Sequence, residues 1–78
     1  MNPPIITDAT VRINHGMADL EVTDSDGTQS VIATCFSDEE EYHSMCALSA
    51  RCKGMTVADA QKAWHNECVR LIRASVTA

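Results

Sequence analysis

The sequence predicts an α+β domain in which a three-stranded antiparallel sheet, a β-meander, is followed by an αα-hairpin packed on one face, in the order β-β-β-α-α. Two stretches before residue 36 alternate apolar and polar residues, as half-buried strands do. After residue 37 two apolar stripes follow helical spacing, with Gly54 between them. The 78 residues suffice for one core. We therefore expect a flexible N-terminal lead-in over residues 1–8 and a single domain over residues 9–78.

The first two strands are predicted from this alternation. From Thr10 onward, Val11 and Ile13 share one face, and Gly16 provides a turn residue for the following hairpin. The second strand carries acidic and polar residues on its water-facing side and apolar residues on its core side. Its core residues are Ala18, Leu20 and Val22.

The third strand begins after a strong turn signal, Asp26-Gly27, and covers about residues 29–36. Strict alternation places Val31, Ala33 and Cys35 on one face, with Ile32 and Phe36 on the other. Helices that cover only one face would leave Ile32 and Phe36 exposed. These two residues are therefore the predicted interface of a homodimer.

The helical half has clear boundary signals. Ser37 and Glu40 match a capping box, Gly54 is placed as the C′ residue of the first helix, and Thr56 with Asp59 starts the second. The predicted buried stripe of the first helix is Tyr42, Met45, Leu48, Ser49 and Cys52. That of the second helix is Val57, Ala60, Trp64, Cys68, Leu71 and Ile72.

The charge of the chain is unevenly distributed along its length. Residues 1–50 carry nine acidic residues and one basic residue, whereas residues 51–78 carry two acidic and five basic residues. A contiguous negative surface would steer association with a basic site on another macromolecule. The predicted partner-binding residues are Asp19, Glu21, Asp24, Asp26, Asp38, Glu39, Glu40 and Glu41.

Two His-x-x-Cys pairs, His43 with Cys46 and His65 with Cys68, raise the alternative of a small zinc-binding domain. On a helical wheel His43 falls on the solvent side, whereas Cys46 lies nearer the core. The close Cys-x-x-Cys pair typical of zinc sites is missing. We expect no metal and no cofactor, and we expect buried, reduced thiols, because the N-terminus lacks the features of an export signal.

Catalysis is not expected, because neither a nucleophile elbow nor a phosphate or dinucleotide loop occurs. Lys62, Arg70 and Arg73 form a basic stripe on the second helix, which we interpret as a solvated face. Direct nucleic-acid binding is not expected at a net charge of −5. The apolar runs are far shorter than the roughly 20 residues that span a bilayer, so we expect no membrane contact and a cytoplasmic protein.

These features predict a small acidic protein-binding module, an inhibitor or adaptor whose acidic surface engages a basic site on a larger protein, including a nucleic-acid-binding site. In size, charge and absence of motifs the chain is similar to phage-encoded inhibitors of host defence, including anti-CRISPR proteins, some of which mimic nucleic-acid charge. The alternative is a homo-oligomeric structural protein that self-associates through Ile32 and Phe36.

Overall fold

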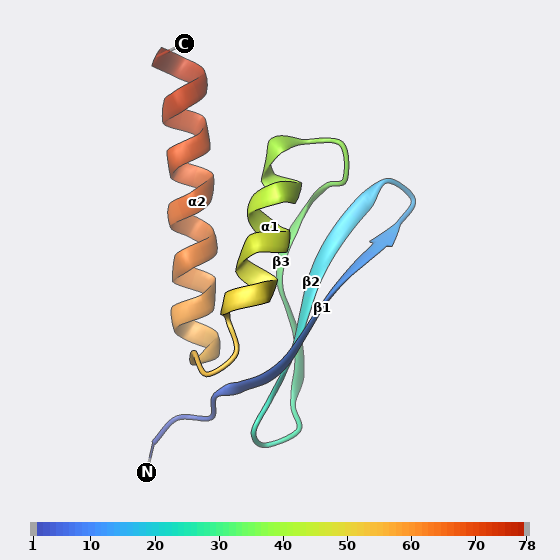
Figure 1. The fold of residues 1–78 in the computed structure, drawn as a ribbon, viewed down its shortest axis with the longest axis vertical. Coiled ribbons are helices and arrows are strands. Elements are labelled where there is room, and N and C mark those ends of the chain that lie inside the picture. Colours follow the sequence, from blue (N-terminus) through green and yellow to red (C-terminus); the bar gives the residue numbers. More distant parts are fainter. Residues whose placement is uncertain (1, 78) are drawn as a thin grey trace.

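The computed structural model describes residues 2–77 and has three antiparallel strands followed by two helices (Figure 1). The strands β1 (Ile6–Asn14), β2 (Met17–Asp24) and β3 (Gln29–Phe36) form an open meander with β2 in the centre. The helices α1 (Glu40–Arg51) and α2 (Val57–Thr77) run antiparallel along one face of this sheet. The predicted fold class is confirmed.

Strand β1 begins at Ile6, earlier than the alternation from Thr10 suggested. The Ile6 side chain is fully buried, its N–H donates to the Met55 carbonyl at 2.7 Å, and its carbonyl accepts from the Gly54 N–H at 2.9 Å. Residues 6–8 thus belong to the sheet, so the predicted lead-in over residues 1–8 is too long. These hydrogen bonds to the turn between the helices provide the tertiary contact that fixes this end of β1.

The core face of β2 agrees with its sequence pattern, because Ala18, Leu20 and Val22 are all buried. They pack with Met45 and Leu48 of α1 in the hydrophobic core. Ile13, however, was predicted to face this core and is exposed. The tip of the β1–β2 hairpin lies clear of both helices (Figure 1), in keeping with the exposure of Ile13 near this end of β1.

A β-bulge changes which residues of β3 are buried. Leu20 pairs with Ala33, but the next residue, Glu21, pairs with Val31, so Ile32 is the extra residue on β3. Ile32 is consequently 7% exposed and Val31 is 53% exposed. Their predicted orientations were therefore wrong. Side chains alternate strictly between the two sheet faces only where the strand has no bulge. No turn residue in this segment of the sequence indicates the bulge.

The two helix starts differ in how they are capped. At α2 the Thr56 hydroxyl accepts from the Asp59 N–H at 3.1 Å, as predicted. At α1 the N-cap is Glu39, without a side-chain cap, and the Ser37 hydroxyl donates instead to the Gly16 carbonyl at 3.1 Å. The predicted Ser37 capping box is therefore wrong. The Gly16 carbonyl, in the β1–β2 hairpin, is the competing acceptor for the Ser37 hydroxyl. This hydrogen bond is a tertiary contact.

Candidate functional site: the acidic end of helix α1 and its two hollows

The first group of predicted binding residues lies on the sheet face that the helices leave open. Asp19 accepts a hydrogen bond from the Thr34 hydroxyl at 2.9 Å, and Glu21 forms an ion pair with Arg12 at 3.3 Å. Both carboxylates are therefore engaged by neighbouring strands. The guanidinium of Arg12 compensates part of the Glu21 charge, whereas the Thr34 hydroxyl that binds Asp19 is neutral.

The second group lies in the turn between β2 and β3. One carboxylate oxygen of Asp24 accepts from the N–H groups of Asp26 and Thr28, at 2.9 and 3.0 Å. This is the Asx-type turn that an aspartate at the first position favours. Asp24 thus stabilises the hairpin, and Asp26 is exposed beside it.

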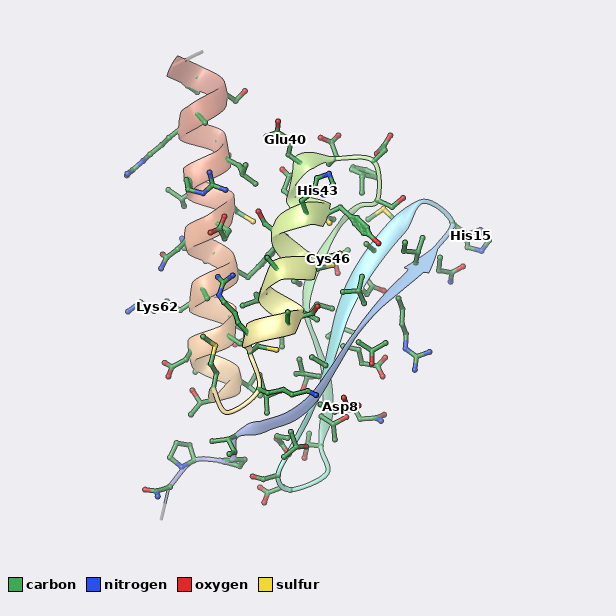
Figure 2. The ribbon with its side chains drawn as sticks, in the orientation of Figure 1. Asp8, His15, Glu40, His43, Cys46 and Lys62 are labelled. Carbon is green, nitrogen blue, oxygen red and sulfur yellow. The ribbon has the colours of Figure 1, made fainter. Side chains whose placement is uncertain are left out.

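The third group, Asp38 to Glu41, lies at the opposite end of β3 from this hairpin, and we call it the acidic quartet. Figure 2 shows Glu40 at the N-terminal end of α1. Within residues 2–77 no cation forms an ion pair with the quartet. The α1 N-terminus favours negative charge at this position. The eight predicted residues thus come from three parts of the fold: the open face of β2, the β2–β3 turn and the segment that leads into α1.

Beside the acidic quartet runs a groove between the start of α1 and the C-terminal part of α2, with a volume of about 610 Å³. Helix α2 extends beyond the N-terminal end of α1 (Figure 1), so its apolar stripe continues without a neighbouring element. Ile72 and Val76 are 62% and 79% exposed. One side of this helix groove is lined by Glu39, Glu40 and Glu41, and the other by Leu71, Ile72, Ala74, Ser75 and Val76.

A second hollow, the aromatic pocket, opens where β3 meets both helices and has a volume of about 430 Å³. Phe36, which is 57% exposed, and the half-buried Trp64 line it together with two glutamates of the quartet. The complete lining is Met17, Thr34, Cys35, Phe36, Glu39, Glu41, Trp64 and Cys68. The apolar stripe of the second helix predicted Trp64 as a core residue. A position in such a stripe indicates burial, but it does not indicate that a hollow lies beside the side chain.

The two thiols in the aromatic pocket are protonated at neutral pH. Burial, together with the nearby Glu41 carboxylate, raises the pKa of Cys35 and also that of Cys68. A raised thiol pKa opposes the nucleophilic thiolate form. Cys35 and Cys68 therefore contribute a neutral, weakly polar surface to this pocket.

The His-x-x-Cys pairs do not converge. His43 and Cys46 are both exposed on α1 (Figure 2), which corrects the expectation that Cys46 lies nearer the core. Across residues 2–77 no three His, Cys, Asp or Glu side chains gather with a geometry that could hold a metal ion. The described residues therefore do not fit a zinc site.

The basic residues of α2, Lys62, Arg70 and Arg73, are all exposed. Arg70 binds Glu67 of its own helix at 2.8 Å. Figure 2 shows Lys62 on the side of α2 that points away from α1. Among the described residues, the acidic quartet lies next to both hollows.

Comparison with protein-family models, with curated proteins and with solved structures finds no match to this chain. Within the described part of the chain, no helix combines the length and apolar character needed to cross a membrane.

Proposed function

We propose that this chain is a small protein-binding module, without catalytic activity, that acts in the cytoplasm as an inhibitor or adaptor. Its acidic surface engages a basic site on a larger protein partner. Among the eight residues expected from the sequence, the acidic quartet at the start of α1 carries this role. In the inhibitory form of the proposal, the partner's basic site is one that otherwise holds nucleic acid, in the manner of anti-CRISPR-like charge mimics.

The observation that supports the proposal is the position of the acidic quartet beside two hollows. Its carboxylates have no cationic partner among residues 2–77, whereas Asp19, Glu21 and Asp24 are engaged internally. Glu39 and Glu41 line both hollows, so charge and apolar surface are presented together. Protein interfaces combine a buried apolar centre with a polar rim in this way.

The test is capture of partners from a lysate by the immobilised chain, at low and at high salt. Replacing Glu39, Glu40 and Glu41 by Gln should weaken capture of a basic protein strongly at low salt, because the electrostatic attraction is removed. A matched control neutralises three exposed carboxylates elsewhere, Asp8, Asp26 and Asp59, by substitution with Asn. Capture that is unaffected by the glutamate substitutions, or equally weakened by the control, would contradict the proposal.

A homodimer is the second candidate, and strand β3 favours it. β3 is an edge strand, and its sequence, Gln29–Phe36, contains no charged residue and no proline. Natural edge strands usually carry such residues to prevent pairing with another chain. Phe36 and Val31 would lie at this interface. Ile32 was assigned to it from the sequence, but the bulge buries that side chain in the core.

A further inference from the structure

We propose that the aromatic pocket accepts an arginine side chain of the protein partner, an inference that rests on the proposed function and specifies its contact. The pocket combines two aromatic side chains with two carboxylates in one hollow. Arginine is the side chain whose planar, cationic head matches both kinds of group.

The aromatic part of the pocket comes from two different elements. Phe36 ends β3 and Trp64 lies in the middle of α2, and both line the same hollow. A guanidinium within about 6 Å of such a ring centre is attracted by the negative face of the ring, most strongly by tryptophan. Met17, which pairs with Phe36 across the ladder, adds a polarisable thioether beside this surface.

The charged part of the pocket is negative. Glu39 and Glu41 are the ionisable side chains of the acidic quartet that line it, and no Lys, Arg or His of the described chain does so. The remaining ionisable groups in the lining are the thiols of Cys35 and Cys68, which burial keeps neutral. A cation entering the hollow thus meets two carboxylates and no opposing positive charge.

The chemistry favours arginine over lysine. A guanidinium can stack on an aromatic ring while its N–H groups point outward to carboxylates, and it is less strongly hydrated than an ammonium group. Lysine presents a compact charge that keeps its water. The pocket should therefore bind an arginine peptide more tightly than a lysine peptide of equal charge.

The chain contains one tryptophan, so Trp64 reports on this pocket directly. We would titrate the full chain with a nine-residue oligoarginine peptide and with the equivalent oligolysine peptide, at low salt. The readouts are Trp64 fluorescence and the NMR signal of its indole N–H. We expect oligoarginine to bind more tightly and to shift the Trp64 signals, with a much smaller shift from oligolysine.

Two substitutions and one control substitution distinguish binding in the aromatic pocket from general electrostatic attraction. Phe36→Ala should weaken oligoarginine binding roughly threefold to thirtyfold, the loss expected for one cation–π contact, and should leave oligolysine binding almost unchanged. Glu41→Gln should weaken oligoarginine binding more than Glu40→Gln does, because Glu40 lies outside the aromatic pocket although it carries the same charge. Circular dichroism verifies that each variant is folded.

Equal binding and equal Trp64 shifts with both peptides, together with no effect of Phe36→Ala, would overturn the arginine pocket. If peptide binding still fell when Glu39, Glu40 and Glu41 were neutralised, the proposed acidic binding surface would remain supported although the arginine pocket would not. Peptide binding that did not change when those three glutamates were neutralised would contradict the proposed function itself.

Discussion

The Ser44 hydroxyl of α1 donates a hydrogen bond to the Glu67 carboxylate of α2 at 3.3 Å, a side-chain link between the two helices. The same carboxylate oxygen accepts from Arg70 at 2.8 Å. The hydrogen bond from Arg70, with smaller contributions from its charge and from Ser44, lowers the pKa of Glu67 below its ordinary value of 4.5. A carboxyl group that is more acidic in the folded state makes stability depend on pH.

The link predicts a loss of stability in acid. A lowered folded-state pKa gives stabilisation that is fully present above the unfolded-state value, about 4.5, and is lost as pH falls through the folded-state value. Glu67→Gln should therefore show a shallower loss of stability below about pH 4.5 than the natural chain, as measured by urea unfolding at several pH values. Asp26→Asn, at an exposed hairpin position, is the control. Identical acid limbs for Glu67→Gln and the natural chain would contradict this role.

The bulge in β3 predicts opposite sensitivities for two adjacent β-branched residues. Ile32→Ala removes a buried side chain and should cost about 2–4 kcal/mol, as large-to-small core substitutions do. Val31→Ala acts on a half-exposed side chain and should cost less than about 1 kcal/mol. Urea unfolding measures both. The reverse order of costs would indicate the unbulged register, in which Val31 faces the core.

The start of α2 predicts a capping effect. Thr56→Ala removes the acceptor for the Asp59 N–H and should cost about 1 kcal/mol, whereas Thr56→Ser keeps the hydroxyl and should cost much less. Thermal unfolding followed by circular dichroism checks both variants. Equal losses for Ala and Ser would mean that the methyl group of Thr56, and not its hydroxyl, stabilises this turn.

The homodimer candidate predicts a mass of twice 8.5 kDa in solution. Val31→Lys places a charge on the exposed face of the β3 edge, and Phe36→Asp places one at its end, so each should give a monomer. Light scattering over a range of concentrations measures the mass. A natural chain that is monomeric at every concentration would remove this candidate. Light scattering measures the oligomeric state in the absence of peptide. A role of Phe36 in the dimer interface can therefore be distinguished from its role in the aromatic pocket.

Much of the fold could be predicted because its signals are local. The alternation in β2, the turn at Asp26-Gly27 and the Thr56 cap each depend on residues a few positions apart. The candidate site could be predicted only in part. The acidic residues are visible in the sequence, but their separation into three groups depends on which hairpin, strand or helix end carries each of them.

The sequence by itself determined the order of the elements, the core face of β2 and the abundance of carboxylates in the first half. Only the tertiary structure decided that Ile32 turns inward and Val31 outward, because a bulge is set by the pairing of two strands. It also decided that Ser37 bonds to Gly16 instead of capping α1. Finally, it brought Phe36 and Trp64, distant in the chain, to the same hollow beside Glu39 and Glu41. Local patterns fix secondary structure, whereas surfaces arise from packing between elements.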